Sequence, residues 1–142
     1  MTERSRGSAG AVLLLRLEEG EDLRQAIVST IEAMGWGAAS VVSAAGGLTR
    51  IAVQLAGAEV PTVIPGPFEI ASLSGTVSGD GTLLVLLATN SRGEAVGGQL
   101  TEGTLATGSC LVVLLELVGV SLEGQEEPED DSLGLRFDEI EG

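Results

Sequence analysis

The side chains that most often carry out catalysis or bind metals are scarce in this chain. It has no histidine, lysine or tyrosine and a single cysteine among its 142 residues. Cys110 lies in the apolar run 110–115 (CLVVLL), and no histidine or lysine is available to turn its thiol into a reactive thiolate. We therefore interpret Cys110 as a buried core thiol. A single cysteine also excludes an internal disulfide.

Carboxylates are the remaining groups that can do acid–base or metal chemistry. Glu116 lies inside the last long apolar segment, but the sequence pairs no second acid with it, so we interpret it as a carboxylate at a sheet end or an interface. The acidic segment 123–142 lacks the spacing of a calcium-binding loop, and we interpret it as solvated. These patterns lean against an enzyme without excluding one, and they predict no cofactor and no bound metal.

The charge of the chain excludes some partners. The net charge is −14, of which residues 123–142 contribute −8 through nine acids and one arginine, and residues 1–122 contribute the other −6. Nucleic-acid binding depends on Lys and Arg side chains that neutralise phosphates, so we expect no direct binding of nucleic acid. The apolar run 9–15 is too short to span a bilayer, so we expect no membrane contact and a cytoplasmic protein.

Apolar periodicity predicts a sheet with one helix. Residues 21–34 place apolar side chains on one helical face, with Glu21 and Asp22 in the first turn, and Gly35 is a typical helix stop. We expect strands at 9–18, 38–45, 50–55, 68–78, 82–89, within 105–120, and at 133–140. Trp36 is expected at the edge of the core. The chain is predicted to be α+β, with a largely antiparallel seven-stranded sheet and one main helix.

Glycine and proline set the expected connections and boundaries. The Gly46-Gly47 pair predicts a hairpin between the strands at 38–45 and 50–55. We expect loops at 56–67, which is rich in proline, and at 121–132, which is acidic. The expected organisation is a flexible start at residues 1–8, one domain at 9–122, and an acidic C-terminal segment at 123–142 that ends in an edge strand.

An ordered set of short motifs is similar to a known family. The motifs are RLEEGEDL at 16–23, SAAGGLT at 43–49, GPFEIASLSGT at 66–76, and a glycine at 93 followed by GGQL at 97–100. In this order they resemble the PPC (plants and prokaryotes conserved) family, also called domain of unknown function 296. The stretch from Gly66 to Gly75 is the most specific of the four.

The resemblance implies a single domain with a seven-stranded sheet and a helix, assembled as a homotrimer. In the plant members, the segment that matches residues 66–71 contacts partner transcription regulators, while separate AT-hook segments bind DNA. This chain has no AT-hook. The name "DNA-binding protein" that bacterial members often carry is therefore not supported by the residues of this chain.

The chain departs from the family at the positions where prokaryotic members typically carry three histidines. The resemblance places Leu83, Val85 and Gln99 there. Leucine and valine offer no lone pair, and a glutamine amide is a poor ligand for Zn²⁺ and its neighbours. We therefore expect a lost metal site, and an apolar pocket in its place that suits a neighbouring subunit's side chain or a hydrophobic ligand.

Two short segments are the candidate contacts for a partner or ligand. The first comprises Gly66, Pro67, Phe68, Glu69, Ile70 and Ala71, and the second comprises Gly97 and Gly98. In a strand, Phe68 is expected in the core, and Glu69 then faces outward as a contact residue or as a plain exposed carboxylate. The glycine pair either lets backbone approach a ligand closely or forms a bulge between strands.

Together these patterns predict a non-enzymatic, oligomeric binding module whose partners are other copies of itself and either a protein or an apolar small ligand. Two alternatives stay open. One is an engineered, self-assembling variant of the family scaffold, and the other is an enzyme or ligand-binding protein that uses a pocket between subunits.

Overall fold

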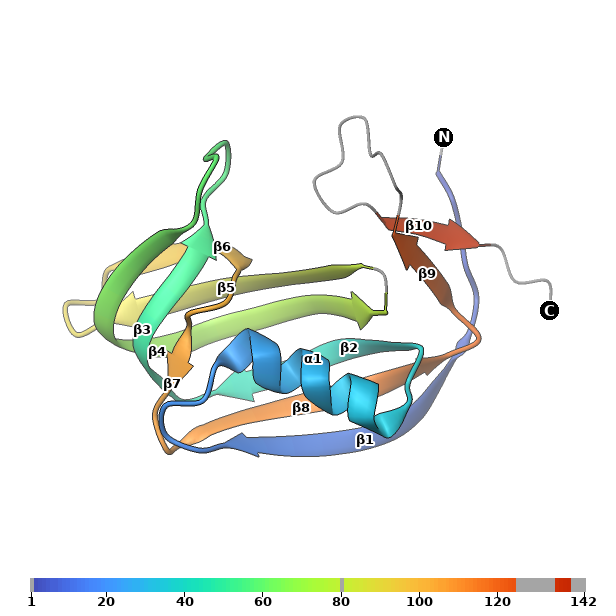
Figure 1. Cartoon of the computed structure of the whole chain (residues 1–142), viewed down its shortest axis with the longest axis horizontal. Helices are drawn as coiled ribbons and strands as arrows, with labels where there is room; N and C mark the ends of the chain where they lie inside the picture. Colours follow the sequence, from blue (N-terminus) through green and yellow to red (C-terminus); the bar gives the residue numbers. More distant parts are fainter. Residues whose placement is uncertain (1, 80, 125–134, 139–142) are drawn as a thin grey trace.

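One helix lies across a strongly curved antiparallel sheet in the computed structural model, which describes residues 2–79, 81–124 and 135–138 (Figure 1). The elements follow the order β1 (Ser8–Leu17), α1 (Leu23–Met34), β2 (Ala38–Ala45), β3 (Gly47–Gln54), β4 (Thr62–Ser78), β5 (Thr82–Asn90), β6 (Ala95–Leu100), β7 (Leu105–Ala106), β8 (Cys110–Val118), β9 (Ser121–Gly124) and β10 (Leu135–Asp138).

The main sheet has eight strands in the order β1-β8-β2-β4-β5-β6-β3-β7, rather than the seven predicted. Its curvature comes from β4, which has 17 residues and pairs with β3 along its first half and with β5 along its second. Because β3 also pairs with β6, the strands β4, β5, β6 and β3 close on themselves at one end of the molecule (Figure 1). The α+β class predicted from the sequence fits this arrangement broadly.

The predicted hairpin between 38–45 and 50–55 is wrong. β2 pairs with β4 and β8, whereas β3 pairs with β4, β6 and β7. Gly46 marks a close crossing instead of a hairpin turn. It has a φ of +127°, and a Cβ there would lie 2.1 Å from the carbonyl oxygen of Ser109.

The predicted loop at 56–67 is also partly wrong, because β4 begins at Thr62 and includes Pro65 and Pro67. Proline lacks an N–H and is tolerated in a strand where no neighbour needs that donor. The first half of β4 pairs with β3 alone, since pairing with β5 begins at Phe68. The prolines are therefore compatible with an extended strand at this edge.

The helix confirms its predicted stop and refines its start. It begins at Leu23, and Asp22 is its N-cap, accepting a hydrogen bond from the Gln25 backbone N–H at 3.0 Å. Asp22 therefore lies before the first turn rather than in it, and it also accepts a hydrogen bond from the Gly103 N–H at 2.6 Å. Gly35 has a φ of +72° and caps the C-terminus, as glycine commonly does.

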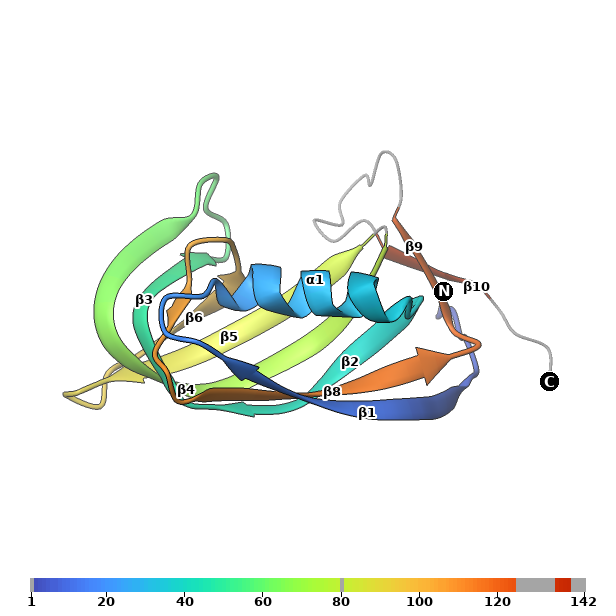
Figure 2. The ribbon, with the colours of Figure 1, turned by 60° about the horizontal axis from the view of Figure 1, so that its bottom comes forward.

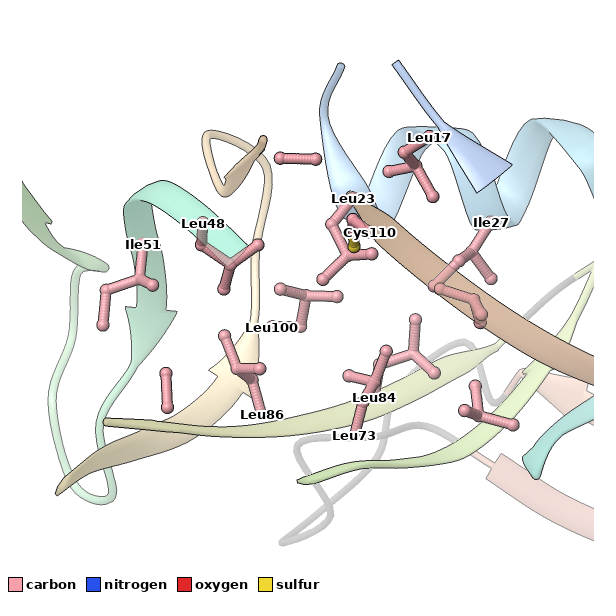
Figure 3. Close-up of a cluster of buried hydrophobic side chains, with 14 of the residues drawn as sticks. Leu17, Leu23, Ile27, Leu48, Ile51, Leu73, Leu84, Leu86, Leu100 and Cys110 are labelled. Atoms are coloured by element: carbon pink, nitrogen blue, oxygen red, sulfur yellow. The ribbon is translucent and has the colours of Figure 1, made fainter. Parts of the chain in front are cut away.

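The core lies between the helix and the concave face of the sheet (Figures 2 and 3). Leu23, Ile27 and Ile31 of the helix pack there against strand residues such as Leu86 and Leu114. Trp36 is partly buried against this cluster, as predicted. Cys110 is fully buried, and burial raises the pKa of its thiol, so its interpretation as a core residue is confirmed.

The C-terminal segment differs from its prediction where the structure describes it. Residues 121–124 form β9 rather than a loop, and β10 pairs with β9 in a separate two-stranded sheet rather than at the edge of the main one. The rest of the predicted loop, residues 125–132, lies outside the described residues. In the described part of the chain, no helix has the length and apolar character needed to cross a membrane.

Candidate binding sites

The outer face of the sheet, opposite the helix, carries exposed apolar side chains. Val12 and Leu14 of β1 are 66% and 63% exposed, and Val42 of β2 is 58% exposed. Leu14 is the register partner of Val113 and Val12 of Leu115, so the same face continues onto the neighbouring strand β8. We call this group, namely Val12, Leu14, Val42, Leu111, Val113 and Leu115, the outer patch.

The outer face continues from the outer patch to β5 across the polar side chains of Ser40 and Thr76. Leu115 pairs with Ser40, Ser40 with Thr76, and Thr76 with Leu83, so these residues lie on one face across four strands. Along β5, Val85 and Leu87 follow Leu83 on that face and are 42% and 40% exposed. The part of the chain that the structure describes places no helix over this face (Figure 2).

The structure brings the predicted degenerate metal positions together on this face. Val85 is the direct register partner of Gln99, and Leu83 lies two residues before Val85 on the same side of β5. Gln99 is also the register partner of Gln54 on β3, a residue that the sequence reasoning missed. Val85, Gln99 and Gln54 thus form a row across three strands.

A cavity of about 520 Å³ lies over this row. Its lining consists of Gln54, Leu55, Ala56, Gly57, Ala58, Val85, Gly98 and Gln99. No imidazole, thiolate or carboxylate lines the cavity, so the donor set does not fit a transition metal. Within the described residues, no cluster of three or more His, Cys, Asp or Glu side chains is arranged to hold a metal ion.

Gly97 and Gly98 do not form the bulge that one interpretation predicted. β5 and β6 stay in continuous register, with Leu86 opposite Gly98 and Leu87 opposite Gly97. A Cβ on Gly98 would lie 2.7 Å from the carbonyl oxygen of Gln54, so glycine allows β6 to approach β3 closely. This approach sets Gln99 beside Gln54.

Residues 66–69 of the candidate segment form part of one wall of a shallow groove. Phe68 is buried, as predicted, and Glu69 is exposed beside it. A cavity of about 230 Å³ is lined by Pro67, Phe68, Glu69, Thr89, Asn90 and Ser91. A second, of about 310 Å³, shares four of these residues and adds Ile64, Pro65, Gly66 and Arg92. We call the two together the proline groove.

The remaining candidates of this segment lie beside the groove. Ala71 is exposed, and Ile70 is half-buried against the core, with its N–H donating to the carbonyl of Gly46 at 2.9 Å. Neither residue lines the proline groove.

The opposite wall of the proline groove is a hydrogen-bonded turn that the sequence indicated only as a change of direction. The Asn90 side-chain oxygen accepts hydrogen bonds from the backbone N–H groups of Arg92 at 3.0 Å and Glu94 at 2.9 Å. The Asn90 amide donates to the Glu94 carboxylate at 2.9 Å, and Arg92 forms an ion pair with Glu94 at 3.0 Å. An asparagine at the start of a turn is a typical signal for such bonding.

Glu116, the carboxylate considered for acid–base chemistry, has a structural contact. Its Oε1 accepts a hydrogen bond from the Ala11 N–H at 3.3 Å, where the β1–β8 register shifts. A Cβ on Gly10 would lie 2.4 Å from that oxygen, so glycine makes room for the carboxylate. This geometry supports its interpretation as a carboxylate at a sheet end.

Comparison with known proteins relates this chain to one domain family and to parts of longer proteins. The model of the Plants and Prokaryotes Conserved (PCC) domain matches residues 4–118. A bifunctional protein GlmU from a Synechococcus strain is 30% identical over 128 residues, which cover 90% of this chain. The match covers 20% of that relative, so the chain spans about a fifth of the length of the curated relatives it matches.

Several solved structures share the fold over nearly their whole length. A hypothetical protein from Salmonella enterica is 26% identical with a TM-score of 0.85, and the match covers 96% of each chain. A metal-containing protein from Archaeoglobus fulgidus is 30% identical with a TM-score of 0.79, covering 99% of this chain and 100% of that one.

A plant- and prokaryote-conserved protein from Pyrococcus horikoshii is 27% identical with a TM-score of 0.76, covering 99% of each chain. Two more distant structures, 14% and 15% identical, carry names that describe them as DNA-binding proteins. At that identity the likeness shows the fold alone.

Proposed function

The chain belongs to the Plants and Prokaryotes Conserved domain family, and from that premise we propose that it is a non-enzymatic binding module that assembles as a homotrimer. The observation that carries this proposal is the outer patch of exposed apolar side chains on β1, β2 and β8. Exposed apolar patches larger than a few hundred Å² are rare on monomers and usually mark an interaction site. A second copy of the chain presents the same apolar chemistry, which suits burial against it.

The oligomeric state of the wild-type chain tests this proposal. Light scattering at low micromolar concentration is expected to give three times the chain mass of 14.4 kDa. A mass of one chain would contradict the proposal. A symmetric particle much larger than a trimer would favour a self-assembling scaffold instead.

We further propose that the proline groove, with the segment 66–71, contacts a protein partner. Its support is an exposed carboxylate, Glu69, beside an apolar wall that includes Phe68, with a hydrogen-bonded turn at Asn90 opposite. A photo-crosslinking side chain placed at position 69 is expected to capture a different protein in cells, and the same side chain at Glu32 on the exposed helix surface serves as the control. Equal capture from both positions would contradict a specific contact.

The module is proposed not to bind DNA directly. The net charge is −14, and the chain contains only seven arginines and no lysine to displace counterions from a duplex. We expect no sub-micromolar binding to duplex DNA at about 150 mM salt, measured by fluorescence anisotropy without added cations. Tight binding under those conditions would overturn this part of the proposal.

The module is also proposed to hold no transition metal at Leu83, Val85 and Gln99, although the Archaeoglobus relative is named as metal-containing. These side chains offer no suitable ligand atoms. Elemental analysis of protein purified without chelators is expected to find no stoichiometric zinc, nickel or iron, and finding any of them at this site would refute the proposal. The triple substitution Leu83→His, Val85→His, Gln99→His is expected to create metal affinity, because Val85 and Gln99 are register partners.

A further inference from the structure

The cavity over Val85, Gln99 and Gln54 is a half-open depression with the volume of a small-molecule site. Its volume of about 520 Å³ lies in the usual range of ligand pockets. Its floor is the row of three register partners on β5, β6 and β3, whose Cβ atoms are expected about 5 Å apart between neighbours. Its wall is the turn at residues 55–58.

Hydrogen bonds fix the shape of the wall. The Gln54 side-chain amide donates to the carbonyl of Ala58, and the Ala58 N–H donates to the carbonyl of Leu55 at 3.0 Å. Gly57 adopts a φ of +76°, which favours glycine at that point of the turn. The Gln54 amide nitrogen is therefore engaged with the wall, and its carbonyl oxygen retains an acceptor for another donor.

The lining is neutral throughout. Its polar side chains are two primary amides, and its apolar surface comes from Leu55, Ala56, Ala58 and Val85. An anion would find no cation in the lining and would be repelled by the net charge of −14, while a cation would find no carboxylate there. A primary amide presents one acceptor and two donors, so the matching group is another uncharged amide edge.

We infer that this cavity binds an uncharged small molecule that combines an apolar body with a carboxamide-like edge. Gln99 pairs with that edge, the carbonyl oxygen of Gln54 accepts a second donor, and Val85 with the 55–58 turn holds the apolar body. The inference deepens the proposed function and rests on it only in treating the chain as a binder.

Two probes of nearly equal size, one uncharged and one anionic, test the site. Benzamide is uncharged, whereas benzoate is its anionic counterpart. In an NMR titration at about 1–10 mM, the range in which fragment-sized ligands bind, benzamide is expected to shift the Val85 methyl and Gln99 side-chain amide signals saturably, and benzoate is not. Equal shifts from both probes, or none from benzamide, would overturn the inference.

A substitution then tests the amide pairing. Gln99→Leu keeps the side-chain bulk and removes the amide, and it is expected to weaken benzamide binding about tenfold because two hydrogen bonds are lost. The matched control, Gln25→Leu on the exposed surface of α1, is expected to leave binding unchanged. Benzamide affinity that is the same for the Gln99→Leu variant and the wild type would contradict the assigned role of Gln99.

Light scattering of the same samples separates this inference from the proposed assembly. A monomer that binds benzamide would overturn the trimer and support the pocket. A trimer that does not bind it would overturn the pocket and leave the assembly standing.

Discussion

Both faces of strand β5 are apolar, but the described part of the chain covers only one of them. Leu84 and Leu86 of β5 point to the concave face (Figure 3), and together with Ala88 they are completely buried in the core cluster. Leu83, Val85 and Leu87 alternate with them on the outer face and remain partly exposed. A strand that is apolar on both faces is usually buried on both. The contrast fits the proposal that a second copy of the chain covers the outer patch on β1, β2 and β8.

Neighbouring leucines in one strand give the largest expected contrast between the two faces. Leu86→Ala is expected to lower the free energy of unfolding by about 2–5 kcal/mol, because it leaves a cavity in a fully buried cluster. Leu87→Ala is expected to change the stability of the chain itself by no more than about 0.5 kcal/mol. Urea denaturation monitored by circular dichroism measures both, and equal losses would erase the distinction between the faces.

The attachment of the helix to the sheet is the next test. Asp22 caps α1 and also accepts a hydrogen bond from the Gly103 N–H. It therefore links the start of the helix to the segment before β7. Asp22→Ala is expected to cost about 1–2 kcal/mol of stability. Glu32→Ala, at an exposed position of the same helix, is the control and is expected to change little. A loss as small as that of the control would show that the cap does not hold the helix in place.

The buried thiol gives a smaller, pH-dependent effect. Burial raises the pKa of Cys110, so the folded state resists forming the thiolate. The contribution of the neutral thiol to the free energy of unfolding is complete below the ordinary pKa of a free thiol. It is lost as the pH rises through the raised pKa of Cys110. As the pH is raised into the alkaline range, the melting temperature of the wild type is expected to fall more steeply than that of Cys110→Ser. Melting temperatures that fall equally steeply with pH in the two proteins would contradict this effect.

The sequence was sufficient for the elements that depend on local chemistry. The helix was predicted from its apolar spacing and from Gly35, and Cys110 and Phe68 were placed in the core by their apolar or alternating surroundings. The family resemblance predicted from contiguous motifs is confirmed by the domain model that matches residues 4–118.

The sequence-based predictions were wrong at glycines and prolines whose role depends on strands that are distant in the sequence. Gly46 resembled a hairpin turn, yet it is required because β8 passes against it near Ser109. Pro65 and Pro67 resembled a loop, yet they occupy a strand half that pairs on one side only. Gln54 was missed at the candidate site because it meets Gln99 only through the closure of β3 on β6, which no local pattern records.

The central claim is that the outer patch is the surface through which copies of this chain assemble. Sedimentation velocity of the double variant Leu14→Glu, Val113→Glu tests it directly, because these register partners lie in the middle of the patch. The variant Gln25→Glu, Ser29→Glu on the exposed helix surface adds the same charge and serves as the control.

We predict that the outer-patch variant sediments as a folded single chain of 14.4 kDa, whereas the wild type and the control sediment as trimers. An outer-patch variant that keeps the mass of the wild type would contradict the account.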